Sequence, residues 1–359
     1  MESPVATTAI VGGRALVGPN LEPLDDATVV IENEVLLAVG AASDIKTPEG
    51  AAIVDATGFT LIPGFLDAHV HIGMAAPADV LKGGVTTVRD LAWPPRDIWS
   101  LSRESRDGHW HGPEILAAGQ MLTVPEGYPL HARWAPDATG RAIRSTVEAR
   151  EAVDEQVDSG ACVIKVALNE LVGPTLDGAT LEAIVEAAHE RGLRVTGHVY
   201  GLGELHKALD AGMDELAHML MSPEPIPAAT ISRMVSQSMT IVPTLSCFFG
   251  DDQTIAIENL RAFVMAGGQF VYGTDLGNEG PRPGIDPREV DALARAGLSG
   301  SDIVASATTR ASAHLGLTDR GTLEAGLYAD VAAVLWEPGG EPLGLSQVGM
   351  VWRRGKRAR

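Results

Sequence analysis

The chain has 359 residues, of which 45% are hydrophobic and 21% charged, a composition typical of a globular protein with one large domain or two. Its 47 acidic and 27 basic side chains give a net charge of −20, which opposes binding to phosphate backbones and excludes nucleic acid as the expected partner. The sequence has no apolar run long enough to cross a membrane, no recognisable secretory leader and only two cysteines. We therefore expect a cytoplasmic enzyme that acts on a small molecule.

The pattern of the first 60 residues indicates short β-strands joined by turns, without a helical period. Apolar segments cover residues 8–11, 27–31, 35–39 and 52–54. Residues 332–336 and 348–352 have the same β character. Because the first segment alone is too small for a stable sandwich, we predict that residues 1–60 and 320–359 form one small composite β-sandwich domain built from both chain ends.

Residues 61–319 follow a different pattern, in which strand-like apolar runs alternate with helical ones. The eight expected strands are 62–71, 85–91, 114–119, 161–167, 193–199, 214–219, 239–245 and 270–275. These runs are rich in Val and Ile, as expected for strands covered on both faces. Eight such units predict an α/β fold with a (β/α)8 TIM barrel rather than an open doubly wound sheet, because no Gly-x-Gly-x-x-Gly turn is present.

The expected strands carry metal-capable side chains toward the mouth of such a barrel. His69 and His71 lie two residues apart on the first strand, so both imidazoles point the same way. Four other strands contribute one residue each: Lys165, His198, His218 and Asp275. Each alone has a structural explanation, such as a hydrogen-bonded core histidine or an aspartate cap. Because barrel active sites lie at the C-terminal ends of the strands, the combination indicates a metal site.

These residues and the segments around them resemble the amidohydrolase superfamily. The segments that carry the resemblance are 54–58, 61–71, 83–90, 164–166, 242–245, 273–275, 306–316 and 321–330. The sequence is most similar to the branch that holds imidazolonepropionase-like hydrolases and metal-dependent Xaa-Pro dipeptidases. It departs from that branch in the short segment 246–269 and at Glu126–Leu130, where dipeptidases often have a Gly-Gly-His type stretch. Both departures concern the substrate pocket and leave the metal site intact.

The resemblance implies hydrolysis of a C–N bond, in a peptide-like or cyclic amide, with two divalent metal ions, usually zinc. His69, His71 and Asp275 would hold the first ion and His198 and His218 the second, with an N6-carboxylated Lys165 bridging both. A bridging hydroxide would attack the carbonyl, and Asp275 would act as general base and then as general acid. The same machinery could cleave an ester, lactone or phosphotriester, and a non-catalytic scaffold is a remote alternative. An acidic protein with exposed β edges could also form a homo-oligomer.

Four further side chains are candidates for contact with the substrate. Tyr200 lies two residues past His198 and could donate a hydrogen bond to a developing oxyanion or a substrate carboxylate, or could be structural. Arg89 ends the second expected strand and could neutralise an anionic substrate, although a salt bridge to Asp90 or a neighbouring acid is equally compatible. Tyr128 and His131 lie in the loop after the third strand. We expect Tyr128 to bind the substrate and His131 to serve as a catalytic residue on a lid.

Three features have no role in this scheme. His109 and His111 form a second His-x-His pair, but they precede the third strand and fall at the opposite face of the barrel, where a surface or structural role is favoured. The basic segment Arg353–Arg359 is short and is expected to be a solvated tail. Cys247 follows the seventh strand and could approach the barrel mouth, but most such thiols are packing residues, and this role is favoured.

Overall fold

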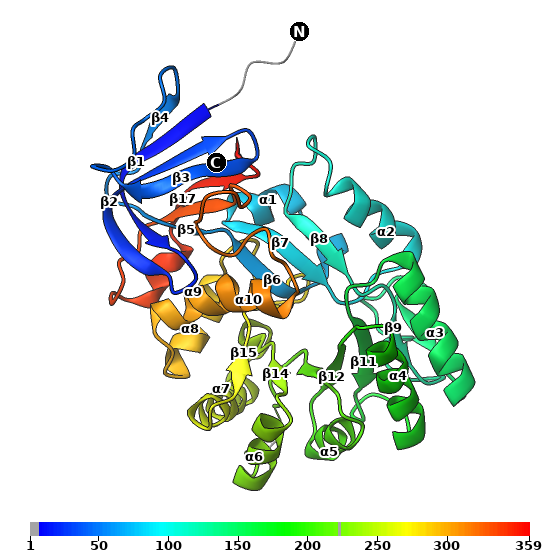
Figure 1. The fold of residues 1–359 in the computed structure, drawn as a ribbon. Helices are drawn as coiled ribbons and strands as arrows, with labels where there is room; N and C mark the ends of the chain where they lie inside the picture. The colour runs from blue at the N-terminus through cyan, green and yellow to red at the C-terminus, as the bar shows by residue number, and fades with distance from the viewer. Residues whose placement is uncertain (1–6, 222–223) are drawn as a thin grey trace.

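The computed structural model describes residues 7–221 and 224–359. Figure 1 shows a β-region of blue and red strands beside a larger set of strands that have helices on their outer side. The blue and red strands come from opposite ends of the chain, yet they belong to one sheet.

This sheet has eight strands in the described residues. The N-terminal part contributes β1 (Thr7–Val17), β2 (Glu22–Glu32), β3 (Val35–Ala41), β4 (Ala52–Asp55) and β5 (Thr60–Pro63). The C-terminal part contributes β16 (Val331–Val334), β17 (Val348–Arg353) and β18 (Lys356–Arg357). The two parts meet where β5 pairs antiparallel with β16, with Leu61 opposite Ala333.

Apolar side chains from both chain ends form one core against this sheet. Ile10, Val29 and Leu61 are buried together with Val331 and Trp352. Burial of such side chains is the main force that holds strands so distant in sequence together. The sheet therefore joins the two chain ends, whereas the two-layered sandwich and the domain limits remain predictions.

The chain between these ends forms two parallel sheets. One has the order β6 (Phe65–Val70), β7 (Val85–Asp90), β8 (Glu114–Ala117). The other has the order β10 (Gly140–Ala142), β9 (Met121–Thr123), β11 (Ile164–Leu168), β12 (Val195–Val199), β13 (Glu215–Leu216), β14 (Thr240–Ile241), β15 (Gln269–Phe270). The longer strands β6, β7, β11 and β12 are buried along their whole length, as expected for strands covered on both faces.

Backbone hydrogen bonds also connect the two parallel sheets to each other at both junctions. At one junction, the Ala68 N–H of β6 donates to the Tyr272 carbonyl just after β15, at 2.9 Å. At the other, the Cys162 N–H just before β11 donates to the Ala117 carbonyl of β8, also at 2.9 Å. Both edge strands of the three-stranded sheet, β6 and β8, are therefore hydrogen-bonded to segments next to strands of the seven-stranded sheet.

Helices follow most of the parallel strands and lie outside them in Figure 1. The α-helices of the described residues are α1 (Pro77–Lys82), α2 (Pro95–Glu104), α3 (Thr146–Ser159), α4 (Gly178–Glu190), α5 (Leu202–Asp210), α6 (Ala228–Ser236), α7 (Gly250–Met265), α8 (Pro287–Arg295), α9 (Gly300–Ala307) and α10 (Thr309–His314). Short 3-10 helices cover Ile72–Met74 (η1), Leu245–Cys247 (η2) and Pro342–Ser346 (η3). Within the described residues, no helix is both long and apolar enough to cross a membrane.

The structure differs from the sequence pattern in several of the expected strands. The expected strand 62–71 is divided, because β5 ends and β6 begins on either side of Gly64. A Cβ at Gly64 would lie 2.3 Å from the Thr86 side chain, so glycine permits the close approach of β7. The strands β9 and β10 are too short for the pattern to predict. In place of the expected strands 214–219, 239–245 and 270–275, the structure has only the two-residue strands β13, β14 and β15.

Candidate metal centre and substrate cavity

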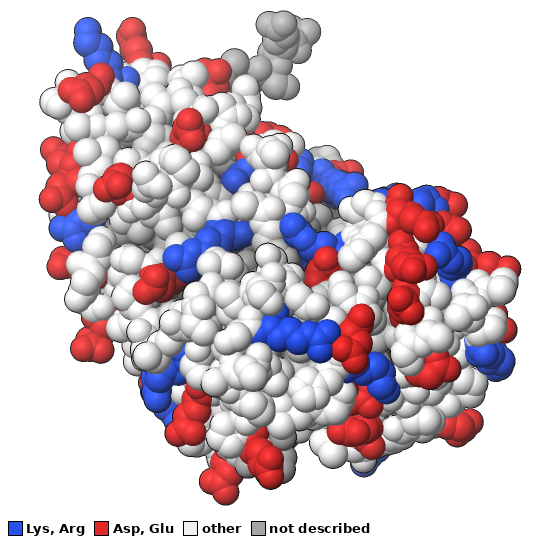
Figure 2. Space-filling view, turned by 60° about the horizontal axis from the view of Figure 1, so that its bottom comes forward, with Lys and Arg blue, Asp and Glu red and all other residues white. Residues whose placement is uncertain are grey.

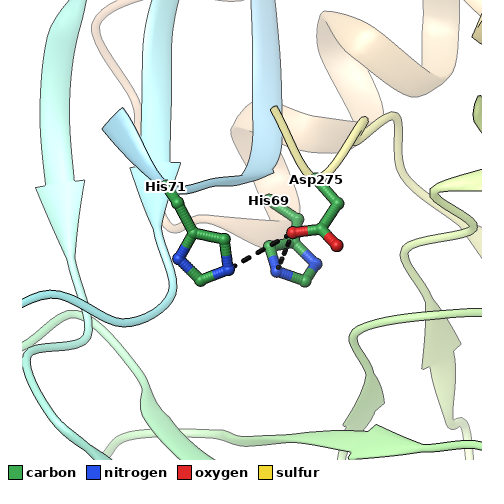
Figure 3. Close-up of side chains that lie close together, drawn as sticks. All are labelled: His69, His71 and Asp275. Carbon is green, nitrogen blue, oxygen red and sulfur yellow. Dashed lines mark ion pairs between the residues drawn. The ribbon is translucent and has the colours of Figure 1, made fainter. Parts of the chain in front are cut away.

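Three side chains meet at the C-terminal ends of β6 and β15. His69 lies in β6, His71 directly follows it, and Asp275 lies in the loop after β15 (Figure 3). Asp275 Oδ1 lies 3.1 Å from His69 Nε2 and 3.3 Å from His71 Nε2. The three residues are 1%, 3% and 5% exposed, respectively. A buried carboxylate oxygen thus faces two imidazole nitrogens.

The backbone around these residues is fixed by a buried carboxylate that is not itself part of the cluster. Asp67 Oδ1 accepts hydrogen bonds from the N–H groups of His69 and Thr274, each at 3.1 Å. Asp67 Oδ2 accepts from the Thr274 hydroxyl at 2.6 Å. The next residue, Asp275, has φ of 59°, a left-handed conformation that is uncommon for a non-glycine residue and frequent at functional sites. Asp67 therefore ties the strand with the histidines to the loop with Asp275.

The remaining nitrogens of both histidines are held by main-chain carbonyls. His69 Nδ1 lies 2.8 Å from the Ala217 carbonyl, and His71 Nδ1 lies 3.1 Å from the Ala92 carbonyl. A carbonyl only accepts, so each Nδ1 carries the proton in the neutral ring and each Nε2 presents a lone pair to the cluster. This is the hydrogen-bonding pattern of metal-ligating histidines.

His198 and His218 form a second pair beside the first. His198 Nδ1 lies 3.0 Å from His218 Nε2, and the His69 and His218 ring centroids are 4.7 Å apart. His218 Nδ1 lies 2.8 Å from the Thr244 hydroxyl, and His198 Nε2 lies 3.0 Å from the Asn169 side-chain nitrogen. The two imidazoles are therefore in direct contact with each other, and the His218 ring lies beside His69 of the first cluster.

Burial controls the protonation of these rings. It lowers the pKa of His69, His198 and His218 well below the usual histidine value, so these rings are neutral near pH 7. For His71, burial acts in the same direction, but the negative charge of the nearby Asp275 carboxylate raises its pKa overall. Neutral imidazole is the form that ligates a metal ion.

Lys165 lies within β11 and is fully buried. Its Nζ has no hydrogen-bond partner among the described residues, and burial lowers its pKa to about 7. His69 Nε2 and Asp275 Oδ1 also lack hydrogen-bond partners. Buried polar atoms of native proteins are almost always hydrogen-bonded, and those left unpaired are costly. Buried donors and acceptors without hydrogen-bond partners are expected where a bound group satisfies them.

The donor set fits a divalent metal ion. His69, His71 and Asp275 form one group whose ligand atoms all lie within 4.8 Å of one another, and His218, Cys247 and Asp275 form another. Imidazole nitrogens with a carboxylate oxygen suit Zn and other first-row divalent ions. Cys247 thus does approach the cluster, the possibility that its position after the seventh expected strand left open beside the favoured packing role.

A cavity of about 340 Å³ opens over the metal-ligand candidates. Asp275 and His198 form part of its floor, and the wall is mostly aromatic and sulfur-containing. The wall and rim residues are Tyr128, Tyr200, Met221, Cys247, Phe248, Phe249, Asp252, Asn278 and Glu279. Several of these come from loops after β14 and β15 that contain no recognisable motif, so sequence reasoning did not find them.

Two of the predicted substrate residues lie in this cavity. Tyr128 stacks on His198 with ring centroids 4.7 Å apart, and Tyr200 lies 4.4 Å from the same ring. Trp134 Nε1 donates a hydrogen bond to Tyr128 Oη at 2.9 Å and holds that ring in place. Burial raises the pKa of Tyr128 and of Tyr200 above the usual phenol value, so both keep their protons as hydrogen-bond donors.

The other two predicted residues, Arg89 and His131, do not line this cavity. Arg89 is 2% exposed, and its Nη2 donates to Glu215 at 2.6 Å while its Nε donates to the Ala68 carbonyl at 2.8 Å. Arg89 therefore forms a salt bridge, as the alternative held, but its partner is Glu215, 126 residues away in sequence, and not Asp90. His131 has a side chain 68% exposed, and it pairs with Glu126 at 3.0 Å. The substrate role of Arg89 and the catalytic role of His131 have no support from these positions.

The sequence pattern of the amidohydrolase family matches residues 60–356, and the chain belongs to this family. It is accordingly a hydrolase that acts on carbon–nitrogen bonds. Ochratoxinase of Aspergillus niger is 25% identical over 93% of this chain and 82% of its own length. Imidazolonepropionase of Streptomyces avermitilis is 25% identical over 94% of this chain and 88% of its own.

Solved structures agree on the fold. The crystal structure of a Xaa-Pro dipeptidase with bound methionine in the active site superposes with a TM-score of 0.83 at 21% identity, covering 98% of this chain and 99% of that one. The family expected from the sequence is thus confirmed, and relatives of both expected kinds, imidazolonepropionase-like and Xaa-Pro dipeptidase, are among the similar proteins.

Proposed function

We propose that the protein hydrolyses an amide-type C–N bond of a small molecule with the help of divalent metal ions. The observation that carries the proposal is a set of buried atoms without a hydrogen-bond partner among the described residues, His69 Nε2, Lys165 Nζ and Asp275 Oδ1, with Asp275 lining an open cavity. A folded chain that leaves such atoms free loses stability unless a ligand satisfies them. Family membership supplies the class of reaction.

Six residues would hold the metal ions. His69, His71 and Asp275 would ligate one ion, and His198 and His218 a second. Lys165, as its N6-carboxylate, would provide anionic oxygens to both, because an ammonium group cannot ligate a cation. When bound, the ions, zinc in this proposal, would acidify a water molecule and polarise the substrate carbonyl.

Asp275 is the proposed proton carrier. Its Oδ1 faces His69 and His71 without a hydrogen-bond partner, and its carboxylate also lines the substrate cavity. It would take a proton from the attacking water and deliver it to the leaving nitrogen, which makes the amine a better leaving group. The tie from Asp67 to Thr274 would keep the carboxylate at this position through both transfers.

Tyr200 is the proposed donor to the developing oxyanion. Its ring lies beside both His198 and His218, at centroid distances of 4.4 and 5.3 Å, and its phenol keeps its proton. A neutral donor aimed at the reacting carbonyl stabilises the charge that forms there. Tyr128, on the other side of His198, would contact the substrate through its ring face.

The aromatic wall of the cavity supports a substrate with a flat or apolar group beside the scissile bond. Phe248 and Phe249 line the cavity with Tyr128, Tyr200 and Met221, whereas the charged lining residues Asp252 and Glu279 are exposed. No Lys or Arg lines the cavity in the part of the chain that the structure describes. A neutral aromatic amide would therefore fit better than a substrate with a free carboxylate at this wall.

We infer that the two parallel sheets form one closed (β/α)8 barrel over residues 61–319. The hydrogen bonds from Ala68 to Tyr272 and from Cys162 to Ala117 support closure, since they link the sheets at both junctions. Residues 1–60 and 320–359 would form the accompanying β-domain. In this arrangement the metal ligands and the cavity lie at the C-terminal end of the barrel, where active sites of this fold are found.

The test is turnover of a substrate panel by metal-loaded and by chelated protein. The panel contains Xaa-Pro dipeptides, N-acyl amides of aromatic amino acids, a hydantoin ring and an aromatic lactone. We expect hydrolysis of an amide member, its loss on chelation and its return with Zn²⁺. Glu49→Gln, at an exposed acid in the β3–β4 connection away from the cavity, serves as a control that should retain activity. Full turnover by the chelated protein would contradict the proposal, and cleavage of the lactone alone would move it to ester chemistry.

A further inference from the structure

Two sequence features without a role in catalysis meet in one hollow of the molecule. The loop between α2 and β8 carries Trp110 and His111, and the β17–β18 turn carries the basic residues of the C-terminal segment. Side chains of both line a hollow of about 210 Å³. The loop leads into the start of β8, whereas the metal-ligand candidates lie at strand ends, so the two sites are at opposite ends of the parallel strands.

The basic segment is not a free tail at this place. Arg353 is 7% exposed, and its Nη2 donates to the Ser105 carbonyl at 2.5 Å. Lys356 Nζ donates to the Gly108 carbonyl at 2.6 Å. Both side chains reach from the eight-stranded sheet to the α2–β8 loop and hold it against the sheet. The expectation of a solvated tail therefore fails for these two residues.

Four basic side chains line the hollow, and among the described residues two of them have no neutralising acid. Arg353 and Arg354 are ion-paired with Glu114, at 3.9 and 3.0 Å, and Glu34 and Asp107 are the acids of the lining itself. In the described part of the chain, Lys356 and Arg357 make hydrogen bonds to main-chain oxygens and no ion pair with an Asp or Glu side chain. This excess stands out on a protein of net charge −20, whose acidic side chains are widespread over the face in Figure 2.

Buried arginine nitrogens in the hollow also lack partners. The Nε atoms of Arg353 and Arg354 have no hydrogen-bond acceptor among the described residues. Arg354 is ion-paired with Glu114 at 3.0 Å through Nη2, so its Nε remains a free donor. Burial lowers the pKa of Arg353, and the nearby Asp330 and Glu114 carboxylates act in the opposite direction. A guanidinium donor without an acceptor is the group that best recognises a planar oxyanion.

The rest of the lining is apolar. Trp110 and Leu81 contribute a ring and a branched side chain, and Trp110 Nε1 is already occupied by the Pro113 carbonyl at 2.8 Å. The indole ring is therefore available to a ligand only for packing. A combination of unpaired cations with an aromatic surface is suited to an anion attached to a flat apolar group.

We propose that this hollow, which we call the basic hollow (Leu81, Trp110, His111, Arg353, Lys356, Arg357), binds a small oxyanion, a phosphate or carboxylate, joined to a flat apolar group. The oxyanion lies between Arg353, Lys356 and Arg357, and the apolar group packs on Trp110. Binding is independent of the metal centre. The ligand touches both segments, because the cations come from β17 and β18 and Trp110 comes from the α2–β8 loop.

The experiment is isothermal titration of the full chain with two probes, inorganic phosphate and benzoate, in metal-loaded and in chelated protein. We expect one site per chain in both forms, with affinity that falls as salt is added. Loss of one charge-assisted contact in Arg357→Gln should weaken binding of both probes about tenfold. Trp110→Leu should weaken benzoate more than phosphate, which separates the aromatic contribution from the ionic one.

The controls separate this site from the metal centre and from general charge. Lys46→Gln, an exposed lysine in the β3–β4 connection, should leave both affinities unchanged. Lys356→Gln would also remove one cation, but it would break the hydrogen bond from Lys356 to the loop as well. Arg357→Gln keeps that hydrogen bond and is therefore the cleaner variant. Equal binding by wild type and Arg357→Gln, or binding that disappears on chelation, would overturn the proposal. Absence of heat with both probes in the wild type would overturn it as well.

Discussion

Two buried polar clusters lie among the parallel strands, and they differ in how far their atoms satisfy one another. In the first, Arg89 donates to one oxygen of Glu215, and His314 hydrogen-bonds the other. In the second, His69 Nε2, Lys165 Nζ and Asp275 Oδ1 have no hydrogen-bond partner. The first cluster can only stabilise the fold, because its groups are already engaged. The second cluster costs stability and therefore indicates where a ligand binds.

The largest effect is expected where the unsatisfied cluster loses its carboxylate. Asp275→Asn should lower turnover of the amide substrate by roughly 10²–10⁴-fold, because an amide cannot carry the proton. The thermal midpoint of the metal-free protein should stay the same or rise, since the change removes a buried charge. Steady-state kinetics and calorimetry measure the two quantities. A variant that loses activity only because it unfolds would contradict the assignment.

The satisfied cluster should respond in the opposite way. Glu215→Gln leaves the Arg89 guanidinium buried without its counter-charge and should reduce the free energy of unfolding by about 3–5 kcal/mol. Urea denaturation of the metal-free protein measures this loss. Glu155→Gln, which breaks the surface pair with Arg141, is the matched control and should change stability little. If Glu215→Gln were as stable as the wild type, the cluster would not have the structural role that we assign.

The stability cost of an unsatisfied buried acid can also be measured as a function of pH, at Glu289. Burial raises the pKa of Glu289 to about 8, and its Oε1 has no hydrogen-bond partner although Oε2 accepts from Ser246 N–H at 2.7 Å. The folded pKa lies above the unfolded one, so stability is complete at low pH and falls as pH rises from about 4.5 to about 8. The wild type should lose on the order of 1–3 kcal/mol over this range relative to Glu289→Gln. Unfolding free energies of both proteins across the range check this, with exposed Glu279→Gln as the control. Parallel pH curves for wild type and Glu289→Gln would refute it.

The smallest effect is expected for His131. Its side chain is 68% exposed and pairs with Glu126 outside the cavity, so His131→Ala should change kcat/KM by no more than about twofold. Tyr128→Ala in the same loop is the contrasting variant, because it removes the ring that stacks on His198. Kinetics on the amide substrate compare the two. A large loss in His131→Ala would return that residue to the catalytic scheme.

The metal-ligand candidates could be found from the sequence because simple geometry governs them. Alternation along β6 turns His69 and His71 the same way, and strand ends of parallel sheets meet at one edge. Lys165 was conspicuous as the single charge in an apolar strand. The contacts of His69 and His71 with Asp275 are those that the sequence pattern predicts.

The substrate residues could not be found in the same way. Arg89 ends a strand, but the alternation along that strand does not reveal that its side chain lies outside the cavity. Its partner Glu215 is too distant in sequence to be identified from the pattern. The aromatic wall comes from irregular segments after β14 and β15, where no period relates position to direction. Contacts that depend on loop conformation are therefore the part of the site that sequence reasoning missed.

The pairing of β5 with β16 has a consequence for biosynthesis. Leu61 finds its partner Ala333 only after nearly the whole chain has left the ribosome. Until then β5 presents an open edge of buried-type residues, Thr60 to Pro63, to the surroundings. A nascent or truncated chain that ends before Val331 should consequently depend on chaperones. The last strands to be synthesised complete the sheet that the first strands of the chain begin.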